Sequence, residues 1–150
     1  MSATFDKTLP IVLGADHAGF EYKELLKTEL AGLGWTVEDK GTHSTDSTDY
    51  PDYAHPVATA VETGSATAGI LVCGSGIGVS ITANRHHGVR AALCWNNEVA
   101  ALCRQHNNAN VLCLPARFIS VDELKQLVHT FLNTEFEGGR HERRVSKMEC

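Results

Sequence analysis

Short apolar runs alternate along the chain with longer segments whose apolar residues recur at helical spacing. The runs Ile11–Leu13 and Ile70–Cys73 are rich in β-branched residues and are each followed by glycine, which is typical of buried strands in a parallel sheet. Near the end of the chain, Ser120 and Glu123 form a capping-box pattern ahead of a segment with one apolar stripe. Together these patterns predict strands near 11–13, 35–39, 70–73, 89–94 and 111–114, and helices near 20–33, 54–61, 77–87, 97–106, 124–132 and from about 140 onward.

This alternation of strands and helices predicts an α/β fold. We expect a three-layer αβα sandwich with a five-stranded, parallel, Rossmann-like sheet, built as one domain over residues 1–150. The last helix, at about 140–150, has few apolar residues to bury, so we expect it to dock on another surface, such as a partner subunit. Because parallel strands end at the same edge of a sheet, Asp16, His17, Asn96 and the loop after Cys73 are expected to share one crevice.

The loop after Cys73 is the strongest candidate for chemistry. Its sequence, Gly-Ser-Gly-Ile-Gly at 74–78, lets the backbone turn sharply and bring N–H groups close to an anion. A helix starting near Ile77 would favour negative charge at the same place, including the thiolate form of Cys73. The alternative is that Cys73 is inert filler of the core, as buried cysteines often are. The glycine spacing matches neither a dinucleotide fingerprint nor a P-loop, so neither NAD nor ATP is indicated.

Composition and charge exclude several classes of function. The formal net charge of −5 indicates no nucleic-acid or membrane-surface partner, and no apolar run approaches the roughly 18 residues of a membrane span. The N-terminal residues lack the plan of a signal peptide. Five cysteines without Cys-x-x-Cys spacing favour a reducing cytoplasm over a disulfide framework or a zinc site. No other metal-ligand motif is present, so we predict no metal.

Three further groups of polar residues have both a functional and a structural interpretation. Asp16 and His17 could orient a hydroxyl or transfer protons, or could be a helix cap beside a surface histidine. His106 and Asn107 could supply an acid or base, or simply end a helix favourably. Arg140 and Arg144, one helical turn apart, could hold a phosphate dianion or lie on a solvated basic helix. The adjacent histidines at 86 and 87 are interpreted as structural or surface residues.

Six blocks of residues, in order over nearly the whole chain, resemble ribose-5-phosphate isomerase type B. The wider family also contains galactose-6-phosphate isomerase subunits, whose catalytic parts are divided between two different chains. This chain carries both sets of blocks, which favours the ribose enzyme. The blocks are Gly-Ala-Asp-His-Ala-Gly-Phe at 14–20, Asp-Lys-Gly at 39–41, Thr-Asp-Tyr-Pro at 48–51, Ile-Leu-Val-Cys-Gly-Ser-Gly-Ile-Gly at 70–78, Arg-Gln-His-Asn-Asn-Ala-Asn-Val at 104–111 and Gly-Gly-Arg-His-x-x-Arg-Val at 138–145.

The resemblance implies a cofactor-free aldose–ketose isomerase of the non-oxidative pentose phosphate pathway. It would interconvert D-ribose 5-phosphate and D-ribulose 5-phosphate through an enediolate. Cys73 corresponds to the base that moves a proton between C2 and C1, with the Ser75 hydroxyl and loop N–H groups stabilising the enediolate oxygen. His106 matches the residue that opens the furanose ring, and His17 is a second candidate for that step. The resemblance assigns substrate binding to Asp16, His17, Gly74, Ser75, Gly76, Ile77, Gly78, Asn107, Arg117, Arg140 and Arg144, with Tyr50 a weaker candidate near the sugar.

The resemblance also implies a homodimer, or a homotetramer of paired dimers, with active sites shared between subunits. Arg140 and Arg144 would then serve the Cys73 loop of the partner subunit. Other functions stay open at this point. The substrate could be allose 6-phosphate, galactose 6-phosphate or a tetrose phosphate, or the chain could bind phosphosugars without catalysis. A thiol-based redox protein is disfavoured, because no resolving cysteine lies near Cys73 in the sequence.

Overall fold

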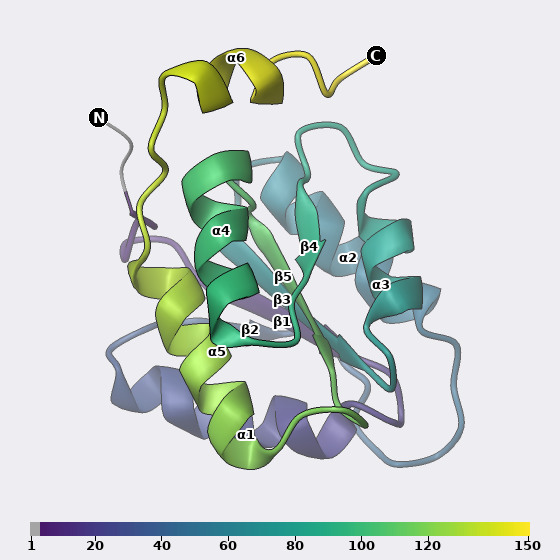
Figure 1. Ribbon diagram of the computed structural model, residues 1–150. Helices are drawn as coiled ribbons and strands as arrows, with labels where there is room; N and C mark the ends of the chain where they lie inside the picture. The colour runs from purple at the N-terminus through teal and green to yellow at the C-terminus, as the bar shows by residue number, and fades with distance from the viewer. Residues whose placement is uncertain (1–3) are drawn as a thin grey trace.

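The computed structural model describes residues 4–150 and consists of a parallel sheet between two layers of helices (Figure 1). All four strand pairings are parallel. Side chains alternate along the central strand, so Ile70 and Val72 enter one core while Leu71 and Cys73 enter the other. The predicted fold class and number of strands are confirmed. The strands are β1 (Ile11–Ala15), β2 (Val37–Asp39), β3 (Ala68–Cys73), β4 (Ala91–Leu93) and β5 (Val111–Pro115), in the order β2-β1-β3-β5-β4.

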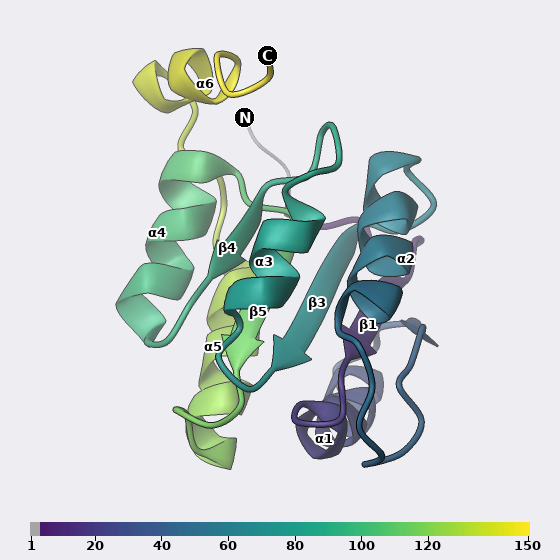
Figure 2. The same cartoon turned by 90° about the vertical axis from the view of Figure 1, so that its right-hand side faces the viewer.

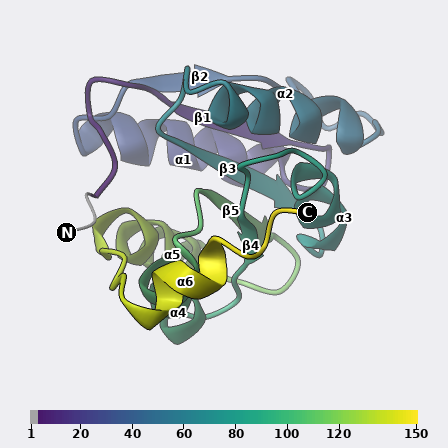
Figure 3. The same ribbon diagram turned by 90° about the horizontal axis from the view of Figure 1, so that it is seen from above.

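The helices cover both faces of the sheet. The residues of α1, α4 and α5 share one buried apolar cluster with β1, β3 and β5, and those of α2 and α3 share the other. The view from above shows the two groups on opposite sides of the sheet (Figure 3). None of the helices among residues 4–150 is long and apolar enough to cross a membrane. The helices are α1 (Phe20–Gly32), α2 (Pro51–Glu62), α3 (Ile77–Ala83), α4 (Asn97–Asn107), α5 (Val121–Asn133) and α6 (Arg140–Val145).

Local hydrogen bonds explain where the elements differ from the predicted ranges. The capping box of α5 forms as predicted, with the Glu123 N–H donating to Ser120 Oγ and the Ser120 N–H donating to the Glu123 carboxylate. β2 begins at Val37 rather than at Trp35, because the Trp35 N–H donates to the Leu30 carbonyl and closes the last turn of α1. α3 ends at Ala83, four residues before its predicted end at position 87. Turns follow it and lead to Gly88, which has a left-handed backbone conformation.

The C-terminal helix docks within its own chain. α6 is six residues long, shorter than predicted, and it packs against the carboxyl end of α4 through its one buried residue, His141. The strand arrowheads in Figure 2 point away from α6, which lies at the opposite end of the molecule from the carboxyl ends of the strands. This placement decides which of the predicted site residues can meet within one chain.

Candidate active site

A pocket of about 440 Å³ opens at the carboxyl ends of β1 and β3, where the sequence predicts a crevice. Most of the residues predicted to bind substrate line it together with Cys73. Asn96 does not line it, because its side chain caps α4 by accepting the Val99 N–H. The lining residues are Asp16, His17, Ala18, Tyr50, Cys73, Gly74, Ser75, Ile77, Gly78, Ile81 and Arg117.

The Cys73 thiol lies at the inner end of this pocket and contacts a backbone donor. Only 5% of Cys73 is exposed. Gly76 adopts a positive φ of 74°, which turns its N–H back to donate to Cys73 Sγ at 3.1 Å. The structure therefore places a hydrogen-bonded thiol beside a solvent-reachable pocket.

Two backbone N–H groups of the glycine loop already donate hydrogen bonds to side chains in or next to the loop. The Gly76 N–H is directed at Cys73, Gly76 itself does not line the pocket, and the Ile77 N–H donates to Ser75 Oγ at 3.3 Å. That the loop from 74 to 78 cradles a substrate oxygen stays a prediction, and in this structure these two amides donate within the loop. Of the loop residues, Gly74, Ser75, Ile77 and Gly78 line the pocket.

Asp16 and His17 reach the pocket from the turn after β1. Asp16 Oδ1 accepts the N–H groups of Ala18 and Gly19, so its carboxylate holds the turn into α1 while it lines the pocket. The two interpretations of Asp16 are thus compatible. His17 Nδ1 accepts the Thr48 N–H at 3.2 Å, so a neutral His17 ring carries its proton on Nε2 and can donate from there.

Arg117 and Tyr50 form the walls of the pocket over two glycines. A Cβ placed on Gly74 would lie 3.0 Å from Arg117 Cζ, and one placed on Gly78 would lie 2.5 Å from the Tyr50 ring. The Arg117 N–H also donates to the Gly74 carbonyl at 3.0 Å, which ties the end of β5 to the Cys73 loop. Glycine at both positions lets a guanidinium and a phenol ring approach the loop closely.

The remaining predicted site residues lie at the other end of the molecule. Helices that connect parallel strands run back against the strand direction, so α4 ends near the amino ends of the strands. His106 and Asn107 belong to this last turn of α4, and Arg140 and Arg144 belong to α6, which packs on it. None of these four lines the Cys73 pocket. Within one chain, the predicted site is therefore divided into two halves.

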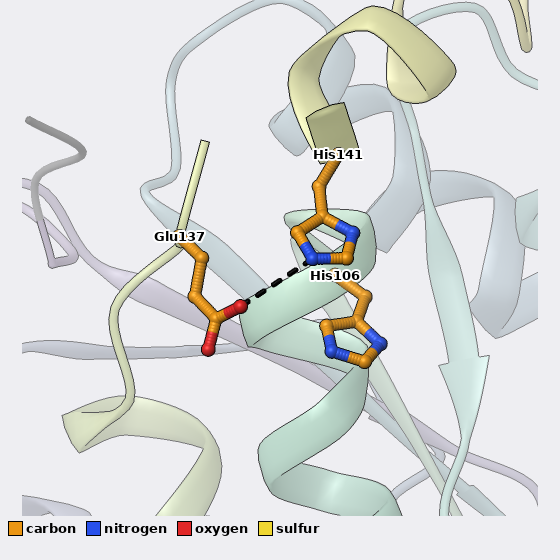
Figure 4. Close-up of side chains that lie close together, drawn as sticks. All are labelled: His106, Glu137 and His141. Carbon is orange, nitrogen blue, oxygen red and sulfur yellow. Dashed lines mark ion pairs between the residues drawn. The ribbon is translucent and has the colours of Figure 1, made fainter. Parts of the chain in front are cut away.

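The second half is organised around a pair of stacked histidines (Figure 4). The rings of His106 and His141 lie 4.2 Å apart between centroids and are nearly parallel, and His141 Nε2 lies 3.4 Å from Glu137 Oε1. Burial lowers the pKa of His141, and the neighbouring His106 and Arg140 lower it further against the opposing effect of Glu137. The sequence singled out His106 but gave no reason to pair it with His141.

Exposed apolar side chains lie in the pocket and in a neighbouring hollow, and the sequence patterns did not indicate most of them. Phe118 is 73% exposed and Trp95 is 54% exposed, and with Ile77 they border a second hollow that touches Ser75. Ile81 is also exposed, one turn after Ile77 on α3, and this four-residue spacing was a signal available in the sequence. We call Ile77, Ile81, Trp95 and Phe118 the apolar rim.

Known proteins share this fold and much of this sequence. The chain is 45% identical over 135 residues to ribose-5-phosphate isomerase B of Escherichia coli K12, which covers 90% of this chain and 91% of that relative. A ribose 5-phosphate isomerase from Thermotoga maritima superposes with a TM-score of 0.90 and is 52% identical, covering 93% of this chain and 96% of that one.

One similar structure contains a sugar phosphate. Ribose-5-phosphate isomerase B from Mycoplasma genitalium, with bound ribulose-5-phosphate, superposes with a TM-score of 0.92 at 43% identity and covers 95% of both chains. Residues 11–148 match the model of the Ribose/Galactose Isomerase family, and the chain belongs to that family.

Proposed function

We propose that this protein is a cofactor-free isomerase that interconverts D-ribose 5-phosphate and D-ribulose 5-phosphate in the non-oxidative pentose phosphate pathway. The observation that carries the proposal is the Cys73 thiol, which borders the pocket and accepts the Gly76 N–H. Relatives similar over nine-tenths of the chain are named ribose-5-phosphate isomerase B, and one similar structure holds ribulose-5-phosphate. Both findings favour this substrate over other sugar phosphates.

The pocket side chains suit proton transfer through an enediolate. Cys73 as thiolate takes the C2 proton of the open-chain aldose and returns it to C1. Ser75, with the amides of the loop that face the pocket, stabilises the negative oxygen that develops between these steps. Asp16 and the His17 Nε2 proton are placed to hold sugar hydroxyls, and the Arg117 guanidinium contributes positive charge for the phosphate.

The rest of the proposed site comes from a second copy of the chain. Four residues with proposed roles lie at the opposite end of the molecule from their own Cys73 pocket and do not line it. They are His106, for ring opening, and Asn107, Arg140 and Arg144, for substrate binding. The apolar rim beside the pocket offers a surface that a partner subunit would cover. We therefore infer a homodimer with shared sites. Four of the five free cysteines are buried thiols, which supports a reducing, cytoplasmic location.

Replacing Cys73 tests the proposed base. We expect Cys73→Ala to lower kcat for ribose 5-phosphate about 10²–10⁴-fold, because general-base catalysis contributes roughly that factor. Binding of ribose 5-phosphate, measured by calorimetry, should change little, since the remaining pocket residues are intact. The matched control is Cys150→Ala, which removes an exposed thiol away from the pocket. Unchanged turnover in Cys73→Ala would refute the mechanism, and wild-type protein that binds without converting would refute the function.

Mixed dimers test the shared site. Neither Cys73→Ala nor Arg144→Ala chains should be active alone. A dimer with one chain of each kind contains one site with both Cys73 and Arg144 intact. Random mixing makes half of the dimers mixed, so about a quarter of the wild-type activity should return. Mixed dimers can be purified through a different affinity tag on each chain. If they stay as inactive as their parents, Arg144 does not serve the partner's Cys73.

A further inference from the structure

Three potential metal ligands from separate parts of the chain meet at the second half of the site. His106 comes from the end of α4, His141 from the first turn of α6, and Glu137 from the segment that joins α5 to α6 (Figure 4). One ligand atom from each lies within 4.8 Å of the other two. The sequence predicts no metal, because these residues match no known ligand spacing. Their meeting depends on the packing of α6 against α4.

The donor set and its spacing suit a tetrahedral ion. Two imidazoles and one carboxylate are ligands that Zn²⁺ accepts, with metal–ligand distances of about 2.0–2.2 Å that place ligand atoms roughly 3.4 Å apart. His141 is buried and provides a fixed anchor, whereas Glu137 is exposed and His106 is half-buried, so both can move inward. His141 Nε2 and Glu137 Oε1 already lie 3.4 Å apart.

We propose that His106, Glu137 and His141 bind a divalent transition-metal cation such as Zn²⁺, with the fourth position open, and that the bound ion inhibits the isomerase. The binding stands on the geometry alone, whereas the inhibition rests on the proposed role of His106 in ring opening. A ring nitrogen bound to the ion cannot exchange a proton with the sugar, so an occupied site would lack this acid–base group.

The stacked rings predict a structural consequence of binding. Nitrogen lone pairs lie in the plane of the imidazole ring, and the two rings are tilted by only 9° at a centroid distance of 4.2 Å. Parallel lone pairs do not converge on one ion, so the His106 ring has to rotate out of the stack. The arginines at 140 and 144, whose charges act on His141, oppose a cation, so we expect micromolar affinity rather than that of a closed structural zinc site.

Metal titration in the absence of turnover tests the binding. The background is a Cys73→Ala, Cys150→Ala chain, because accessible thiolates are competing zinc ligands. We expect one Zn²⁺ per chain by calorimetry and, with Co²⁺, visible absorption bands of a four-coordinate site. Glu137→Gln, an exposed change that preserves the fold, should weaken Zn²⁺ binding more than about tenfold, as should His141→Ala.

A second histidine cluster provides the matched control. His86 lies between His55 and Glu62, with ring nitrogens 2.7 Å apart and a carboxylate at 3.0 Å. His86→Ala should leave the Zn²⁺ affinity unchanged. If His86→Ala abolishes binding and Glu137→Gln does not, or if the double cysteine background binds no metal, the proposed site is wrong.

Activity measurements then test the inhibition. Zn²⁺ should inhibit the wild-type isomerase reversibly, with EDTA restoring the rate, and Glu137→Gln should keep the basal rate while becoming more than about tenfold less sensitive. Metal bound at this site with an undiminished rate would overturn the inhibition. Failure of the proposed function would be seen differently, as metal-free wild-type protein that does not convert ribose 5-phosphate.

Discussion

At the scale of single residues, the shape of the pocket depends on glycines that leave space for neighbouring side chains. Gly74 has no side chain where Arg117 passes, and a Cβ there would lie 3.0–3.1 Å from three atoms of the guanidinium group. Because this is the far end of a flexible side chain, the protein can move it at little cost in stability. The displacement would instead withdraw positive charge from the pocket. We therefore expect Gly74→Ala to raise KM for ribose 5-phosphate severalfold with a small effect on unfolding.

Steady-state kinetics and urea unfolding of the same samples separate these effects. Gly32→Ala is the matched control, because a Cβ there meets nothing within 4 Å and position 32 closes α1. That change should leave KM alone and stabilise the fold by about 0.4–1 kcal/mol. A Gly74→Ala enzyme with wild-type KM would show that Arg117 does not contact the substrate.

At the scale of elements, buried charges fasten α1 to the edge strand β2. The fully buried Lys23 and its neighbour Lys27, both on α1, donate to Asp39 Oδ2 of β2 at 2.7 and 2.9 Å. Burial opposes ionisation of Asp39, but hydrogen bonds from Lys23, the Gly41 amide and Lys27 outweigh it and lower its pKa from 3.8 to about 2. A carboxylate with a depressed pKa stabilises the fold above its unfolded pKa and loses that contribution as the pH falls towards 2.

Replacing Asp39 should therefore change both stability and its pH dependence. We expect Asp39→Asn to lower the free energy of unfolding at pH 7 by about 2 kcal/mol, and to lose less stability than wild type between about pH 4 and pH 2. Denaturant unfolding across this pH range measures both effects. Glu38→Gln, which removes only an exposed pair with Lys40, should behave like wild type. Parallel pH curves for wild type and Asp39→Asn would contradict this account.

Secondary-structure elements were predictable where a local sequence pattern determines them, and less predictable where tertiary contacts do. The apolar run Ile70–Cys73 and the capping box at Ser120 are local patterns, and both formed as expected. The start of β2 was misplaced because Trp35 still bonds to α1, and the packing of His141 on His106 joins segments that no spacing relates. Tyr50 over Gly78 is a contact of the same kind.

At the scale of the whole molecule, the opposite directions of strands and connecting helices explain why the two halves of the proposed site lie at opposite ends of one copy. Parallel strands deliver Cys73, Asp16 and Arg117 to one edge of the sheet, and the returning helix α4 carries His106 to the opposite edge (Figure 2). No rotation of side chains can close that separation, whereas a two-fold axis would place one end of each copy against the other end of its partner. The sequence patterns alone could not separate the two groups of predicted site residues, because the end of the sheet that each group reaches is decided only when strands and helices assemble; only the family resemblance implied that Arg140 and Arg144 serve a partner.

The apolar rim provides the whole-molecule prediction. Phe118 is 73% exposed beside the pocket, and a charge there would have to be buried if a partner covers the rim. We expect Phe118→Glu to shift the protein towards monomer in analytical ultracentrifugation and to lower kcat in parallel, because a monomer brings no His106 to Cys73. Leu25→Glu, an exposed apolar position on α1 away from the pocket, should leave both assembly and rate unchanged. A fully active Phe118→Glu monomer would show instead that one chain completes its own site, and the two halves would then need another explanation.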